Sequence, residues 1–331
     1  MIIKTGARAA EVKPLPPVVV NKEYTPTVEV TWSRTEKPKP VKVPVERLHL
    51  EVGFHRDVPN PVYHRGLRTD VKPLSSTFAK ELIHYAPVVV EHRQRTFEAS
   101  PAMWFGQAFH ELVLEGGYQT VEWRDYATWQ SKAAIEDKLA ILAQDLTPGL
   151  MRDRPALEGM QAAVLAHPDA GPILASGGET EVAALAFDPV NEVWLQAKFD
   201  WLSIDEESKT AVFMDLKTVQ SSMPDEFARD AVKYDYPLQR AFYAHVLHLL
   251  GYTVRQFAWL TVEKTAPYLV GLHDLTPDDQ EFGQSRVNHA ILKYKQYMEY
   301  ARTGEYPGLR GINTPDLPVW YGYDTERITN E

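Results

Sequence analysis

Two apolar runs joined by a polar turn occupy residues 193–217, near the middle of the chain. The first, WLQAKFDWL, and the second, AVFMDLK, have the aromatic and branched content of buried strands, and DEESK between them predicts a tight turn. Charged residues stand where a core strand should stay apolar: Asp200 in the first run, Asp215 and Lys217 in the second. A hairpin of the two strands would bring these three side chains together.

The spacing of the second run decides which way its charges point. Side chains alternate faces along a strand, so Asp215 and Lys217 share one face and Leu216 points into the opposite layer. Two carboxylates and an ammonium at the end of a buried sheet are costly unless something binds there, and a divalent cation is the natural ligand. A D-x-K pattern also occurs where a strand runs out into solvent, so the motif alone leaves both interpretations open.

The absence of cysteine narrows the chemistry. Among 331 residues there is no Cys, which excludes disulfides, thiolate zinc sites, iron–sulfur clusters and cysteine nucleophiles. Any metal must be held by oxygen and histidine ligands. The chain has 44% hydrophobic and 24% charged residues, is long enough for one large domain or two modest ones, and has no apolar run that would span a bilayer. With no signal-peptide pattern at the N-terminus, we expect a cytoplasmic protein without membrane contact.

Charge is unevenly distributed. The net charge is −10, yet residues 1–50 hold nine Lys or Arg against five Glu, a net +4, which leaves −14 on the remaining residues. An acidic body disfavours bulk attraction to nucleic acid. Local basic residues still act within a Debye length, so DNA contacts would have to be focused.

The chain divides into an arm and a domain. Residues 1–70 are predicted to form a basic, Pro-rich arm. Alternating residues at 24–32 and 41–45 suggest a small β-hairpin within it, and a partly ordered tail is the alternative. Residues 71–331 are expected to form one α/β domain with a helical N-terminal part.

The expected element order follows from periodicity, caps and breakers. The tail 306–323 is expected to pack as an irregular strap. Helices are predicted at 77–85, 87–95, 102–115, 127–145 and 150–167, strands at 179–187, 193–202 and 211–217, helices at 224–233 and 237–250, strands at 254–262 and 268–274, and a last helix at 277–301.

Four features occur in a fixed order along the chain: His110 in the helical GQAFHELVLE, Asp200, the D-L-K-T of residues 215–218, and Gln239 with Tyr243 one helical turn apart. This series resembles the PD-(D/E)xK nuclease superfamily, in particular its RecB-like branch. The segments LSSTFAKELIHYAPVVVEHRQR and SPAMWFGQAFHELVLE further resemble the RecE-type phage exonucleases. The resemblance covers roughly residues 72–321. It departs from the pattern at Phe199, which stands where the name-giving Pro would precede Asp200.

The resemblance implies a restriction-endonuclease-like mixed central sheet flanked by helices. It also implies a magnesium-dependent 5′-to-3′ exonuclease on double-stranded DNA ends that leaves single strand for an annealing protein, with manganese as a substitute and two ions per site. On the same basis the metal ligands would be His110, Asp200, Asp215 and the carbonyl of Leu216; Lys217 would position or activate water, and Gln239 and Tyr243 would hold DNA or order the edge of the site.

Several alternatives remain open from the sequence. Glu181 is either a further metal ligand or a strand-surface charge. Four aromatic residues either stack on single-stranded bases or pack in the core: Trp104, Tyr118, Trp123 and Trp129. The chain could instead be an endonuclease, a single-strand exonuclease, a DNA-end-binding scaffold without activity or an acidic adaptor protein. A homo-oligomeric ring around DNA is a further hypothesis, because enclosure would let an acidic body hold a polyanion.

Overall fold

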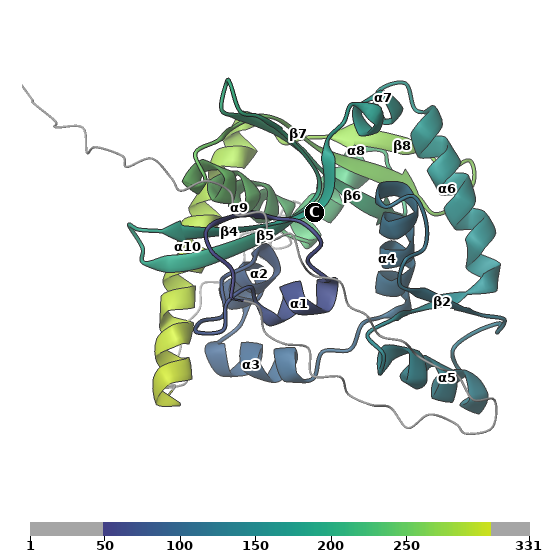
Figure 1. The fold of residues 1–331 in the computed structure, drawn as a ribbon, viewed down its shortest axis with the longest axis horizontal. Helices are drawn as coiled ribbons and strands as arrows, with labels where there is room; N and C mark the ends of the chain where they lie inside the picture. The colour runs from purple at the N-terminus through teal and green to yellow at the C-terminus, as the bar shows by residue number, and fades with distance from the viewer. Residues whose placement is uncertain (1–48, 306–331) are drawn as a thin grey trace, which may run out of the picture.

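The computed structural model describes residues 49–305 of the chain. The segments expected to form an N-terminal hairpin, 24–32 and 41–45, and the strap expected at 306–323 lie outside this range. Within it the fold is α/β, with a mixed central sheet flanked by helices, as the sequence predicted (Figure 1).

The central sheet has six strands in the order β1-β4-β5-β6-β7-β8. From β1 to β6 neighbouring strands are antiparallel; β6 and β7 are parallel, and β8 returns antiparallel to β7. The parallel pair requires a crossover, which α8 (Pro224–Lys233) and α9 (Tyr236–Leu249) provide. The strands span Gly53–His55 (β1), Glu179–Asp188 (β4), Val193–Asp205 (β5), Thr210–Val219 (β6), Thr253–Glu263 (β7) and Val270–His273 (β8).

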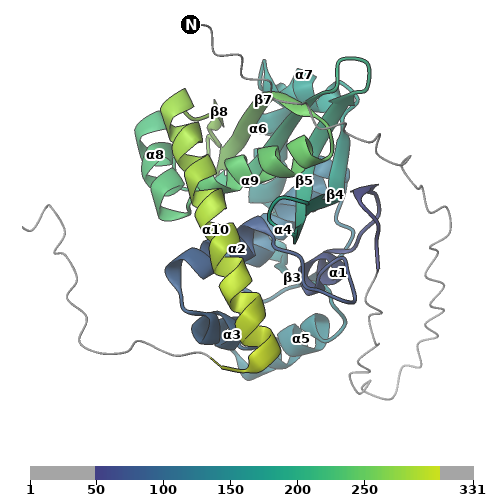
Figure 2. The ribbon, with the colours of Figure 1, turned by 90° about the vertical axis from the view of Figure 1, so that its left-hand side faces the viewer.

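One face of the sheet is covered by α2 (Ser76–His84), α9 and α10 (Pro277–Thr303). Figure 2 shows α10 running the length of the molecule in front of α2 and α9, with α3 (Pro87–Arg95) at its C-terminal end. Phe199, Phe213 and Trp259 from the sheet form the largest apolar cluster with these helices.

Within residues 49–305 no helix is both long and apolar enough to cross a bilayer.

The opposite face is covered by α4 (Pro101–Leu114), α6 (Arg154–Ala166) and α7 (Ala170–Ala175). Phe109 of α4 packs there on Leu216 of β6. Two serine caps begin the helices that border the site: Ser75 accepts from the Phe78 N–H at the start of α2, and Ser100 caps α4 in the same way. Their hydroxyls satisfy amides that have no partner within the helix.

The helices expected at 127–145 and 150–167 are shorter and are separated by a strand. α5 covers Lys132–Leu142, and the segment between the two expected helices belongs to β3 (Thr147–Leu150), which pairs in parallel with β2 (Val121–Arg124). The reason lies at Gly149, where an added Cβ would come within 2.7 Å of the Trp123 ring. A glycine in a strand marks such a close approach.

Residues 49–70, which we expected to belong to the arm, pack against the sheet. β1 pairs with β4, and α1 (Asn60–Arg65) places Val62 and Tyr63 against Ala183 and Leu185.

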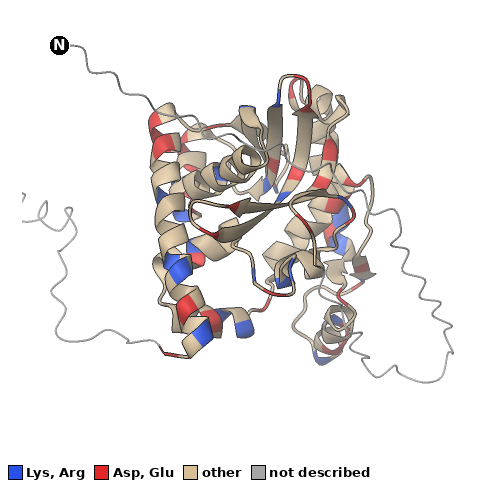
Figure 3. Ribbon diagram, turned by 60° about the vertical axis from the view of Figure 1, so that its left-hand side comes forward, with Lys and Arg blue, Asp and Glu red and all other residues tan. Residues whose placement is uncertain are grey.

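Charged residues of both signs are interspersed over the helices and the sheet rather than segregated on one side (Figure 3).

Candidate active site

The site lies where β5 and β6 separate. Their ladder ends at the pair Trp201 and Met214, so Asp200 and Asp215 are the first residues beyond it. The backbone N–H of Leu216 donates to Asp200 Oδ2 at 2.7 Å. The carboxylate thus takes the place of the backbone carbonyl that a neighbouring strand would otherwise offer. The predicted approach of Asp200 to the D-L-K segment is therefore present in the structure.

Glu181 lies across from Asp200 on β4. Thr180 and Val182 on either side of it pair with β5, whereas Glu181 itself has a left-handed backbone with φ of 56°. This conformation costs a non-glycine residue about 1–3 kcal/mol and so persists only where the surrounding structure holds it. The irregularity coincides with the acidic centre, which favours a ligand role for Glu181 over the strand-surface interpretation.

His110 of α4 completes a cluster with these two acids. Its Nδ1 lies 3.6 Å from Asp200 Oδ2 and 4.0 Å from Glu181 Oε1, and one ligand atom from each residue lies within 4.8 Å of the others. Its Nε2 lies 2.9 Å from the Leu216 carbonyl. A carbonyl only accepts, so Nε2 is the donor of this hydrogen bond, and Nδ1 is the ring nitrogen that faces the acids.

These groups suit a divalent cation. Two carboxylates and one imidazole form an oxygen-rich set of the kind that magnesium or manganese accepts. Burial raises the pKa of Asp200 to about 6, although His110 opposes that shift. A cation would relieve the cost of the buried carboxylate. The Leu216 carbonyl, predicted as a ligand, is hydrogen-bonded to His110 and orients that ring.

Asp215 and Lys217 form the second part of the site. Asp215 is only 3% exposed, and its Oδ2 lies 2.5 Å from Lys217 Nζ, which confirms that the two side chains share a face. Gln239 of α9 donates to the other oxygen, Asp215 Oδ1, at 2.7 Å. Asp215 thus faces Lys217 and Gln239 and lies outside the three-residue cluster of His110, Glu181 and Asp200.

The charge of Lys217 follows from its neighbours. Burial lowers the pKa of this ammonium, but Asp215 and Asp200 raise it, and the net result lies above the ordinary value of a lysine. Lys217 is therefore protonated at neutral pH and can donate hydrogen bonds. In this arrangement Lys217 cannot act as a proton acceptor.

Gln239 and Tyr243 have different surroundings although they lie one turn apart on α9. The Tyr243 ring packs against Phe199 at 5.1 Å and Phe213 at 6.0 Å between ring centroids. It supports the floor of the site, while Gln239 contacts Asp215 directly.

Two lysines that the sequence analysis missed also border the site. Lys198 Nζ lies 2.6 Å from Glu181 Oε2, and Lys80 of α2 donates to Gln239 Oε1 at 3.2 Å. Lys198 could have been found, since it precedes Asp200 by two residues on the same strand. Lys80 carries no motif, and only the packing of α2 against α9 brings it to the site.

All these side chains line one cleft of about 800 Å³. Its walls come from α1, α2, α4, the strands β4 to β6, α8 and α9. Five carboxylates line the cleft, with Glu181, Asp200 and Asp215 at its centre and Glu226 and Asp230 on α8. It also has five ammonium groups, an arrangement suited to an anionic ligand held beside a cation. The five are Lys80, Lys198, Lys217, Lys233 and Lys264.

A family model described as a PDDEXK-like domain of unknown function matches residues 75–309. The chain belongs to this family. The matched range contains every predicted site residue, and membership in the PD-(D/E)xK superfamily is thereby confirmed. The PDDEXK-like assignment agrees with the mixed sheet and with the acids at the end of its central strands. The family assignment supports the prediction that the protein is a nuclease. Membership in the RecE-type branch stays a prediction.

Two further comparisons add little to the family assignment. A crystal structure described as a "Putative exonuclease" from Eubacterium rectale is similar at 14% identity and a TM-score of 0.48, over 74% of this chain and 91% of that one. No residue role is transferred from it. A comparison with curated proteins finds no match.

Proposed function

We propose that this PDDEXK-like protein is a divalent-metal-dependent DNA exonuclease. The observation that carries the proposal is the convergence of His110, Glu181 and Asp200 beside the Asp215–Lys217 pair, at the point where two central strands separate. These groups line one side of a cleft that also presents ammonium groups for phosphates.

The residues divide the work between them. His110, Glu181 and Asp200 would hold a divalent cation, which supplies charge neutralisation at the phosphodiester and an activated water. Lys217, held protonated by Asp215, would donate to the attacking water or to a phosphate oxygen. Gln239 fixes the rotamer of Asp215 and so positions Lys217.

The finer specificity rests on the motif series. The order of His110, Asp200, the D-x-K of residues 215–217 and the Q-x-x-x-Y of residues 239–243 supports a RecE-type exonuclease. We therefore propose magnesium, with manganese as a substitute, and 5′-to-3′ digestion of double-stranded ends that yields single strand for an annealing protein. The excess negative charge outside the first fifty residues supports a ring that encloses DNA.

Digestion of linear and covalently closed circular DNA tests the activity. Linear duplex with a label at either the 5′ or the 3′ end should be shortened in magnesium or manganese, while closed circles stay intact and EDTA stops the reaction. Calcium should not support cleavage, because its looser geometry is a poor match for in-line attack. Nicking of the circle would identify an endonuclease, and full activity in excess EDTA would rule out the metal.

Light scattering tests the ring separately. A closed ring requires an oligomer at working concentration and long digestion per binding event. A monomer that releases DNA after a few nucleotides would remove the ring and leave the active-site proposal intact.

A further inference from the structure

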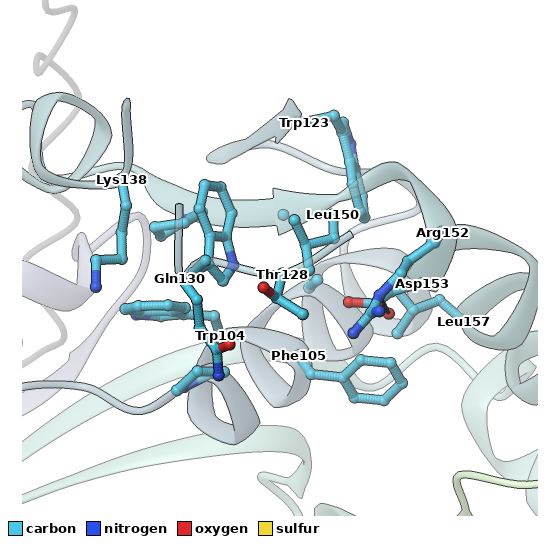
Figure 4. Close-up of a pocket in the computed structure, with 15 residues that line it drawn as sticks. Trp104, Phe105, Trp123, Thr128, Gln130, Lys138, Leu150, Arg152, Asp153 and Leu157 are labelled. Carbon is cyan, nitrogen blue, oxygen red and sulfur yellow. Dashed lines mark ion pairs between the residues drawn. The ribbon is translucent and has the colours of Figure 1, made fainter. Parts of the chain in front are cut away.

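A second cavity, of about 340 Å³, lies beside the cleft between α4, the β2–β3 pair and α5 (Figure 4). We call it the indole pocket. Its aromatic wall includes Trp104, Trp123 and Trp129, and its polar lining includes Lys138, Arg152 and Asp153.

The aromatic walls are held in place by specific packing. Trp104 and Trp129 are 8% and 9% exposed and meet edge to face, with ring centroids 6.3 Å apart and an interplanar angle of 84°. Trp123 is seated over Gly149, where no side chain would fit. Three indoles fixed around one hollow provide flat surfaces for an aromatic ligand.

The polar atoms of the pocket indicate what such a ligand carries. Trp104 Nε1 is buried and has no hydrogen-bond partner within the described residues, so a ligand with an acceptor would satisfy it. Figure 4 shows Lys138 on one side of the aromatic wall and Arg152 with Asp153 on the other. Lys138 Nζ lies 5.9 Å from the Trp104 ring, and the Arg152 side chain is 58% exposed. A flat heteroaromatic ring with attached phosphate matches this combination.

The indole pocket and the cleft share the N-terminal turn of α4 but lie on different sides of that helix. Ala102 and Met103 line the cleft, and the next two residues, Trp104 and Phe105, line the indole pocket. Successive residues of a helix point in different directions, so the N-terminal turn of α4 itself separates the two spaces. A strand whose backbone leaves the cleft across this turn would present its bases to the indoles.

We propose that the indole pocket binds one unpaired nucleobase of a DNA strand whose adjoining backbone lies in the active-site cleft. The inference rests on the proposed function, since it takes the occupant of the cleft to be DNA. Stacking on an indole face would provide the affinity, and Lys138 would contact the phosphate. The pocket would then favour ends with a short single-stranded overhang over blunt ends.

Binding measurements on the full chain test the pocket. The Asp215→Ala background keeps the DNA intact, and anisotropy gives Kd for a blunt duplex and for the same duplex with an overhang. 2-Aminopurine placed at successive overhang positions reports stacking. Trp129→Ala should weaken binding of the overhang DNA about tenfold and abolish quenching at one position, with the blunt duplex unaffected.

Two further variants guard against a folding defect at Trp129. Trp104→Phe keeps an aromatic wall and removes the Nε1 donor, and Lys138→Gln removes the cation without opening the core; each should weaken overhang binding selectively. Phe282→Ala, an exposed aromatic of α10, is the matched control and should change neither Kd.

The outcomes separate the two proposals. If the wild type digests linear DNA but Trp104→Phe, Trp129→Ala and Lys138→Gln all bind overhang and blunt DNA as their Asp215→Ala parent does, the nucleobase pocket is overturned and the nuclease stands. Equal weakening on both DNAs also overturns it. If the wild type neither binds nor digests DNA, both proposals fall.

Discussion

Gln239 Nε2 donates a hydrogen bond of 2.7 Å to Asp215 Oδ1, linking helix α9 to the centre of the sheet. The same amide accepts from Lys80 Nζ through its oxygen, so its orientation is fixed from both ends. Asp215 is thereby left with one oxygen for Lys217. The helix that supplies Gln239 therefore sets the geometry of the charged pair on β6.

Replacing Gln239 should impair catalysis more than folding. Gln239→Leu removes the donor to Asp215 and leaves a buried carboxylate oxygen unpaired, at a cost of about 1–3 kcal/mol in the free energy of unfolding. Loss of such a supporting contact typically lowers activity about 10- to 100-fold. Nuclease rates with melting curves check this, with Gln296→Leu, an exposed glutamine of α10, as the control. An unchanged rate would show that Asp215 does not depend on Gln239.

Removing either member of the charged pair should abolish cleavage. Lys217→Ala removes the ammonium that we place at the reacting phosphate, and Asp215→Ala removes the carboxylate that holds it. Each loss should cost several kcal/mol of transition-state stabilisation, or about a thousandfold in rate. Single-turnover digestion of end-labelled duplex measures the loss, and circular dichroism reports the fold. Lys295→Ala, an exposed lysine on α10, should retain the wild-type rate. Near-normal digestion by a folded Asp215→Ala or Lys217→Ala protein would refute the site assignment.

Metal binding should weaken below about pH 6. Burial raises the pKa of Asp200 to about 6, and a cation binds only the ionised carboxylate, so protons compete with the metal below that pH. The folding stability of the metal-free protein should change in the opposite direction. The contribution of Asp200 to that stability falls as pH rises from about 4 to 6, because the folded state favours the protonated carboxyl group. The rise in Tm on adding magnesium should therefore be larger at pH 8 than at pH 5.

Asp200→Asn provides the control for that measurement. The amide oxygen can still accept from Leu216 N–H, so the fold is preserved while the titrating group is lost. Its Tm should respond little to magnesium at either pH. A magnesium-induced shift that is the same at pH 5 and pH 8 in the wild type would contradict the assignment of Asp200 as a ligand.

Lys80 should bind a DNA phosphate in a pH-dependent way. Burial, followed by the nearby Lys217, lowers the pKa of Lys80 to about 8, and no carboxylate of the described chain forms an ion pair with it. Lys80→Met should raise Kd for duplex DNA about five- to tenfold. Binding by the wild type should weaken from pH 7 to pH 9 as Lys80 loses its proton, whereas Lys80→Arg should stay flat.

Anisotropy at fixed ionic strength measures these Kd values. Lys295→Met removes an equal charge from the exposed side of α10 and controls for the change in net charge. Equal pH profiles for wild type and Lys80→Met would show that another group titrates.

Local patterns predicted the strand core of the site well. Period-two alternation placed Asp215 and Lys217 on one face, and two apolar runs with a polar turn predicted the β5–β6 pair that brings Asp200 near them. His110 was found through its place in the motif series, and its ring does meet Asp200.

The remaining features depend on tertiary packing that short patterns do not encode. Glu181 joins the centre through a left-handed backbone, and nothing in its neighbouring residues signals this conformation. Lys80 reaches the site only because α2 packs against α9. The strand at residues 147–150 was missed because a Pro-Gly break looks like a loop until a partner strand and the Trp123 ring lie over it.

The hydrogen bond from Leu216 N–H to Asp200 makes one carboxylate serve both the backbone and the proposed chemistry. Asp215 and Lys217 have no comparable duty to the main chain. Under mutational drift, a copy of this gene released from selection for cleavage could discard Asp215 or Lys217 and remain folded. It would keep an acceptor at Asp200 for longer, because the separated strands still need one. Among the residues of the site, Asp200 would therefore be retained longest in descendants that no longer cleave DNA.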